Sequence, residues 1–425
     1  MTTYKKIMNI ALPAMAENFL QMLMGMVDSY LVASLGLIAI SGVSVAGNII
    51  TIYQAIFIAL GAAISSLISK TLAQGDKERL AYHTAEAIKL TLLLSLLLGL
   101  ISLLFGRQML DLLGTEKAVA EAGGFYLALV GGTIVLLGLM TSLGALVRVM
   151  RNPRFPMYVS LLTNVLNALF SGLGIYVFRL GIVGVALGTV LARLVGVLIL
   201  WWKLDLSTIS WSWGLDGELL RLSLPAAGER LMMRAGDVVI IAIVVVFGTD
   251  AVAGNAIGEV LTQFNYMPAF GVATATVMLV AHAVGEGDMQ AVSLIRQRAF
   301  WLSFACMLPL ALGIFALGRP LTLLYTDNSG AITASLSVIL FSLLGTPMAA
   351  GTVIYTAVWQ GLGNARLPFY ATTIGMWLIR IVSGYLLGVT FGLGLPGVWA
   401  GTLLDNGFRW LFLKVLFDRK MREIT

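Results

Sequence analysis

Long apolar runs, separated by short polar breaks, recur along the chain from Ile7 to Phe417. Each run has about 20 residues, which is the length that a helix needs to cross the roughly 30 Å hydrocarbon core of a membrane. We count about twelve such runs. Charged residues make up 11% of the chain, whereas soluble domains have about 25%. The sequence therefore predicts an all-α polytopic membrane protein with twelve transmembrane helices.

The polar breaks differ in charge along the chain. Lys and Arg gather in one alternating set of breaks, while the other set holds only Arg107, Lys117, Arg179 and Arg319. By the positive-inside rule, both termini are expected in the cytoplasm of a multi-pass protein of the plasma or inner membrane. The net charge of +6 then calls for no nucleic-acid partner, because basic loops are usual beside lipid headgroups.

The chain also contains an internal repeat. The segment ALPAMAE, which starts at Ala11, returns as SLPAAGE, and AQGDKE returns as GEGDMQ, both at a shift of 212 residues. RNPRFPMY, which starts at Arg151, returns as GNARLPFY at the same shift, and GVALGT returns as GVWAGT at a shift of 213. Four matches in register over half of the chain indicate a duplicated architecture.

The repeat predicts two lobes of six helices each. Because six is even, both lobes start on the same side of the membrane and are related by a pseudo-twofold axis along the membrane normal, a recurring design of secondary transporters. We expect the N-lobe at residues 1–202, a polar cytoplasmic linker at residues 203–222 and the C-lobe at residues 223–425. Alternating access is the natural use of such a pair.

A search for the motifs of known enzymes gives little support for catalysis. Gly285 to Asp288 matches the GxGD pattern of intramembrane aspartyl proteases, yet both copies of this repeat fall in a charged break. No HExxH motif, Ser-His pairing or phosphate-binding glycine loop occurs. The single cysteine, Cys306, excludes a disulfide framework. We expect no enzyme and no cofactor, so transport against a gradient has to be driven by an ion gradient.

An acidic residue, Asp28, lies within the first apolar run. A charge at membrane depth is costly unless it faces a polar cavity or a partner, so Asp28 is a functional candidate. The series Glu17, Gln21, Met24 and Asp28 has spacings of four, three and four, which place all four on one helical stripe. Pro13, near the start of this run, is expected to bend the helix.

Several of these segments together resemble a known family. VDSYLVASLG, the GDKE break, RNPRFPMY followed by TNVLNALFSGLGIY, and GIVGVALGT are similar in order and spacing to the multidrug and toxic compound extrusion (MATE) transporters. These belong to the multidrug/oligosaccharidyl-lipid/polysaccharide exporter superfamily. The resemblance implies an antiporter, expected as a monomer in membrane lipid, that exports small amphipathic cations in exchange for H⁺ or Na⁺. Flippases for lipid-linked oligosaccharides or other anionic lipid precursors, from the same superfamily, are the alternative.

The resemblance also implies a cation site in the N-lobe. Carried over by position, its members match Asp28, Asn167, Ser171 and Thr189. Family members have a second carboxylate where this chain has Ser171, and a hydroxyl cannot titrate. A lone carboxylate suits proton uptake and release, whereas Na⁺ would need several oxygens from these four residues. A structural role, in which Asp28 only bonds to neighbouring helices, is the other interpretation.

The C-lobe departs further from the family. The family's alternative site uses an acidic tenth helix, but the run over residues 338–361 has no acid. Other polar and charged residues lie at membrane depth there, and Met24 and Met233 are expected to add flexible apolar lining. Arg234 with Asp237, and Asp405 with Arg409, have the spacing of helical ion pairs. The substrate-site candidates are Glu17, Gln21, Met24, Glu229, Met233, Arg234, Asp237, Asn255, Glu259, Gln263 and Arg380. The flippase alternative depends on Arg193, Arg230, Arg234, Arg380 and Arg409.

Overall fold

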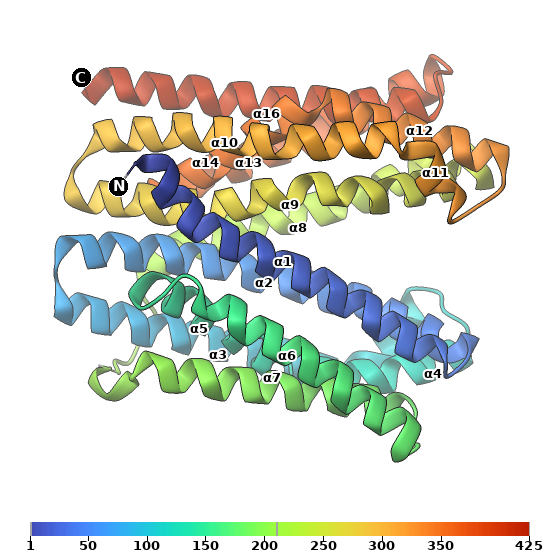
Figure 1. Cartoon of the computed structure of the whole chain (residues 1–425), viewed down its shortest axis with the longest axis horizontal. Coiled ribbons are helices and arrows are strands. Elements are labelled where there is room, and N and C mark those ends of the chain that lie inside the picture. The colour runs from blue at the N-terminus through green and yellow to red at the C-terminus, as the bar shows by residue number, and fades with distance from the viewer. Residues whose placement is uncertain (1, 210, 425) are drawn as a thin grey trace. The chain divides into compact units, whose positions relative to one another are not determined.

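The computed structural model describes residues 2–209 and 211–424. Met1, Ser210 and Thr425, which fall in the predicted N-lobe, linker and C-lobe, lie outside these ranges. Within them the chain is helical and contains no strand (Figure 1). The predicted all-α class is confirmed.

The chain forms two compact units. The unit Ala16–Ser223 contains the later part of α1 and most of the predicted N-lobe. Its further helices, with π-helical turns labelled η1 and η2 and a 3₁₀ turn labelled η3, are α2 (Leu37–Gln74), α3 (Lys77–Leu112), α4 (Lys117–Tyr126), η1 (Leu127–Gly131), α5 (Val135–Met150), α6 (Phe155–Gly172), η2 (Leu173–Val177), α7 (Ile182–Leu204) and η3 (Leu206–Thr208).

The second unit consists of Met1–Met15 and Leu224–Thr425. It contains the start of α1 (Thr3–Ala33) and most of α8 (Gly217–Val245). The remaining elements, of which η4 and η5 are π-helical, are α9 (Thr249–Glu286), α10 (Met289–Ala316), α11 (Gly318–Leu323), α12 (Ser329–Leu344), α13 (Thr346–Gly361), α14 (Arg366–Thr373), η4 (Ile374–Arg380), α15 (Ile381–Tyr385), η5 (Leu386–Thr390) and α16 (Leu395–Ile424).

Twelve helical spans can be followed in the described chain. Eight helices are long and apolar enough to cross a membrane, and two bent pairs raise the number to ten. The bent pairs are α4 with α5, at 43°, and α12 with α13, at 58°. The second bend lies at Gly345, just before Pro347, which cannot continue the hydrogen-bond ladder. The remaining two, α8 and α16, have 29 and 30 residues but carry more charged side chains.

The internal repeat is confirmed by the positions of the helix ends. α2 and α9 each have 38 residues, and both bounds of α9 lie 212 positions after those of α2. After each of them, a glycine with positive φ, Gly75 or Gly287, ends the helix. An aspartate then caps the next helix: Asp76 accepts from the backbone of Arg79, and Asp288 accepts from that of Ala291.

Two helices are each divided between the units. The first residues of α1 belong to the unit that holds the C-lobe, where Ile7 and Ala11 are fully buried in a core with Val272 and Leu413. The rest of α1 belongs to the other unit, and α8 changes unit after Ser223. Whereas the sequence placed boundaries at 202 and 222, the compact units divide inside two helices.

The segment before α8 is held against α3 by charged groups. His83 Nδ1, which is buried, lies 2.6 Å from Asp216 Oδ2. Glu86 accepts from the Asp216 backbone N–H at 3.1 Å, and Lys89 donates to the backbone oxygen of Ser212 at 3.0 Å. Outside this buried group, an exposed ion pair joins Arg79 to Glu218 at 2.7 Å. The predicted linker is therefore attached to the unit Ala16–Ser223.

Replacing Asp216 with Asn is expected to loosen this segment. Asn still caps the start of α8, where Asp216 accepts from the Glu218 backbone at 2.9 Å, but it loses the charge-assisted bond to His83. Chymotrypsin should then cleave beside the exposed Trp211 and Trp213 several-fold faster than in the wild type. Asp205→Asn is the matched control, because that side chain accepts only from Ser207. Equal cleavage of D216N and wild type would contradict the role of His83.

Candidate functional site

Helices α1 and α6 bring polar groups together around Asp28. Asn167, on α6, donates from Nδ2 to Asp28 Oδ1 on α1 at 2.8 Å. One turn further along α6, Ser171 donates to the Asn167 side-chain oxygen at 3.3 Å. Asn167 and Ser171 are buried, and Asp28 is half-buried. The structure thus places three of the four residues of the predicted cation site in one hydrogen-bonded chain.

The fourth predicted residue, Thr189, is held by its own helix. Its hydroxyl donates to the Val185 carbonyl at 3.1 Å, and Ser171 shares this acceptor at 3.4 Å. α6 and α7 pack side by side here (Figure 1), because Gly188 presents no side chain to Ser171. A Cβ on Gly188 would lie 2.4 Å from Ser171 Oγ and 2.6 Å from its backbone nitrogen. The glycine therefore sets the distance between these two helices.

Two further residues complete this cluster. Tyr126, at the end of α4, interacts with the Thr189 side chain and with the charge of Asp28. Arg193, one turn after Thr189 on α7, interacts electrostatically with Asp28 and Tyr126. No pattern in the sequence pointed to Tyr126. Arg193 could have been predicted as a member of the cluster, because it lies four residues after Thr189 and so on the same face of the helix.

The other candidates on α1 have more ordinary partners. Glu17 forms an ion pair with Arg148 of α5 at 2.5 Å, so its charge is neutralised by a neighbouring helix. Gln21 is exposed and accepts from Gln54 at 3.3 Å. Met24 is half-buried. Asp28 thus lies in the polar cluster, whereas Glu17 lies in an ion pair that joins two helices.

A corresponding cluster lies in the other unit. Arg380 donates from Nη1 to Asp237 of α8 at 3.2 Å and from Nε to Thr402 of α16 at 3.1 Å. Thr402 corresponds to Thr189 in the repeat at a shift of 213, and Arg380 corresponds to Asn167 at the same shift. In both units an aspartate is thus bound by a side chain from the fifth predicted helix of the lobe, with a threonine from the sixth beside it.

The change of shift from 212 to 213 has a structural cause. η4 is π-helical, and its turns contain one more residue than α-helical turns. The corresponding stretch in the first unit lies within α6, which is α-helical to Gly172. Close approaches between helices follow the new shift: Gly188 packs against Ser171, and Gly401 packs against Gly384. The extra residue therefore turns Arg380, rather than Ile379, toward the cluster.

The remaining acidic candidate of this cluster is Glu259 on α9. It interacts with Asn255 one turn earlier and with the charges of Arg380 and Asp237. Asn255 in turn accepts from Trp399 Nε1 at 2.9 Å. Asp237 and Arg380 are engaged with each other, whereas the side chain of the exposed Glu259 has Asn255 as its one hydrogen-bonding neighbour among the described residues. Arg234 and Asp237 have the spacing of a helical ion pair, but the partner of Asp237 is Arg380.

A second group of charges in this unit is structural. Arg409 and Asp405 form a bidentate ion pair with two distances of 2.8 Å, as their spacing predicted. Gly375 makes room for it, because a Cβ there would lie 2.2 Å from Asp405 Oδ1. Nearby, the buried Glu229 accepts from Thr372 at 3.1 Å and interacts with the charge of Arg409. Glu229 is thus surrounded by protein groups.

The other candidates lie outside these clusters. Gln263 and Arg234 are exposed, and Met233 is half-buried. In the ranges that the structure covers, no three His, Cys, Asp or Glu side chains converge as a metal site.

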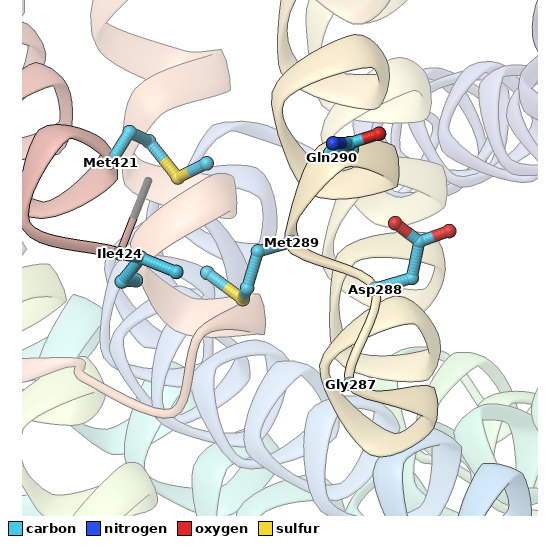
Figure 2. Close-up of a pocket in the computed structure, with 6 residues that line it drawn as sticks. All are labelled: Gly287, Asp288, Met289, Gln290, Met421 and Ile424. Carbon is cyan, nitrogen blue, oxygen red and sulfur yellow. The ribbon is translucent and has the colours of Figure 1, made fainter.

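A surface pocket at the start of α10 has a different lining. Figure 2 shows Met289 extending toward Met421 and Ile424, with Asp288 and Gln290 on the other side. This pocket contains no residue of either charged cluster.

The close approach at Gly188 gives a test of the first cluster. Gly188→Ala is expected to push α6 from α7, because the new Cβ meets the backbone of Ser171. Overpacking of this kind costs roughly 1–3 kcal/mol, so the thermal midpoint in detergent should fall and transport should be lost. Gly172→Ala is the control, since a Cβ there meets nothing within 4 Å. An unchanged midpoint in G188A would refute the proposed spacing.

Comparison with known proteins identifies the family. The MatE family profile matches residues 13–173 and 225–386. A probable multidrug resistance protein NorM of Thermotoga maritima is 28% identical over 97% of this chain and 91% of its own length. The multidrug resistance protein MdtK of Photorhabdus laumondii is 25% identical over 94% of this chain and 92% of its own.

Solved structures show the same fold. A crystal structure of MATE in complex with MaL6 superposes with a TM-score of 0.91 at 20% identity, over 100% of this chain and 97% of the other. A MOP superfamily transporter from Pyrococcus furiosus, whose binding pocket is described as having reverse polarity, gives a TM-score of 0.90 at 20% identity over 99% of this chain and 96% of the other. The chain is a multi-pass membrane protein that belongs to the MatE family of multidrug and toxic compound extrusion transporters.

Proposed function

We propose that this protein is a secondary multidrug antiporter that exports amphipathic organic cations by alternating access and takes up protons at Asp28. The names of its relatives, multidrug resistance proteins NorM and MdtK, support multidrug export. The distribution of Lys and Arg supports a plasma or inner membrane location with both termini in the cytoplasm. The protein is proposed to act as a monomer.

The lone carboxylate of the first cluster carries the proposal for the proton. Asp28 is held by the amide of Asn167 at 2.8 Å, so it is positioned for exchange without a second acid. Of the other oxygens of the predicted site, that of Asn167 accepts from Ser171, and the Thr189 hydroxyl is turned to donate to Val185 of its own helix. Na⁺ binding requires several converging oxygens. A proton requires only the carboxylate.

Glu259 supports the proposal that the substrate is a cation. Asp237, its neighbour, already bonds to Arg380 at 3.2 Å, and Arg380 also donates to Thr402. With two acids and one arginine, this cluster carries one uncompensated negative charge when all three are ionised. An organic cation at Glu259 would neutralise it.

The arginines weigh against a flippase for anionic lipid precursors. Such a substrate would need guanidinium groups that are free to bind phosphate. Arg409 donates from Nε and Nη2 to Asp405, and Arg380 is bound to Asp237 and Thr402. Arg230 interacts with the charge of Glu229. The pairing of these three arginines favours the multidrug proposal, whereas Arg193 and Arg234, the other two arginines of the flippase alternative, form no ion pair among the described residues.

Asp28→Asn tests the coupling step. The amide keeps the size of the side chain but takes up no proton at physiological pH, so efflux driven by a pH gradient should fall to background while the protein still reaches the membrane. Efflux of a cationic dye from proteoliposomes measures this. Asp327→Asn, which alters an exposed aspartate between α11 and α12, should transport as the wild type does. Full efflux in D28N would contradict the proposed coupling role of Asp28.

Glu259→Gln tests substrate recognition. If Glu259 neutralises the exported cation, its loss should raise the KM for a singly charged dye on the order of tenfold, the equivalent of about 1.4 kcal/mol. The pH dependence of efflux should stay as in the wild type. Glu286→Gln removes an exposed carboxylate at the end of the same helix and serves as the control. An unchanged KM would exclude Glu259 from the substrate site.

A further inference from the structure

Arg193 is a permanent positive charge inside the Asp28 cluster. Its Nη1 atom is shielded from solvent and has no hydrogen-bond partner among the described residues. Its guanidinium interacts electrostatically with Asp28 and with Tyr126. An arginine keeps its charge under all conditions that a folded protein experiences. The half-buried Arg193 forms no hydrogen bond among the described residues that would hold helices together.

The charges around Asp28 can be counted from each packed helix. α1 contributes the carboxylate itself, and α4 contributes Tyr126. α6 contributes the neutral Asn167, and α7 contributes Arg193. With Asp28 ionised, the cluster is neutral, and an added Na⁺ would give it a net positive charge. Repulsion between Na⁺ and this guanidinium is screened less at a half-buried site than in bulk water.

We propose that Arg193 is a tethered cation that prevents Na⁺ from binding at Asp28 and so determines the ion selectivity of the transporter. The inference rests on the proposed coupling role of Asp28 and adds the residue that sets the ion. Arg193 stays fixed to α7 and cannot leave the site, so it balances the carboxylate without being transported. An exchangeable metal cation would have to share the one negative charge with it.

Two features of the cluster make its net charge more positive. Ser171 stands where the resemblance to the family implies a second carboxylate, which lowers the negative charge of the site by one. Arg193 adds one positive charge. Together they make the site two charges more positive than a site with two acids and no arginine. Such a change disfavours any added metal cation, because the attraction that would offset its dehydration is gone.

Na⁺ titration of the purified protein tests this inference. A ligand that binds only the folded state raises the thermal midpoint in a saturable way. The midpoint of the wild type should not respond to NaCl beyond its response to choline chloride of equal ionic strength. Arg193→Met, which keeps an unbranched side chain without charge, should gain a saturable response at a Na⁺ concentration at least about tenfold below any response of the wild type. Arg193→Lys should behave as the wild type does.

Control variants locate the response. Asp28→Asn combined with Arg193→Met should abolish the gained response, because no carboxylate remains. Arg319→Met, which removes an exposed arginine of α11, should gain none. If Arg193→Met does not fold, Arg193→Gln is the second neutral variant.

Two outcomes would overturn the inference. One is a saturable Na⁺ response of the wild type that Asp28→Asn removes. The other is a folded Arg193→Met protein that ignores Na⁺. Dye efflux driven by a pH gradient in wild-type proteoliposomes tests the proposed function separately, because its absence would refute proton coupling while the Na⁺ titration stays interpretable.

Discussion

A charge that leaves water for the interior of a membrane needs a partner, and this constraint organises both units of the protein. Glu17 meets Arg148, Asp405 meets Arg409, and Asp237 meets Arg380. Each of these pairs joins a carboxylate to a guanidinium whose geometry matches it, and most connect different helices. After this pairing, a small number of charged groups keep a charge that is not fully compensated by a partner. These are the groups to which the proposed transport chemistry is assigned.

Much of the architecture follows from the sequence because its causes are local and periodic. Apolar runs of membrane-spanning length give the helices, and the repeated Gly-Asp breaks reappear as a left-handed glycine followed by an aspartate cap at Gly75, Asp76, Gly287 and Asp288. The predicted companions of Asp28 also lie together, since Asn167 bonds to it directly. These companions were predicted from the resemblance to a family, and no pattern of spacing in the sequence would have predicted them.

Other features depend on contacts between distant helices and left no local signal. Tyr126 lies in a stretch of glycine and apolar residues, yet it reaches Thr189 and the charge of Asp28. Asp237 has a basic neighbour at helical spacing, Arg234, but bonds to an arginine 143 positions away. The division of α1 after Met15 also has no marker beyond Pro13. Pairing across helices is decided by which side chains can meet in three dimensions.

The π-helical stretch η4 has a consequence for how duplicated membrane proteins diverge. Its wider turn takes up one added residue, so the side chains after it keep their orientation at an offset that is larger by one. An alignment of the two halves at one fixed offset pairs Asn167 with Ile379 and overlooks Arg380. A single insertion can thus be accommodated within one helix of a duplicated half, and a search for internal symmetry has to allow its offset to change within a helix.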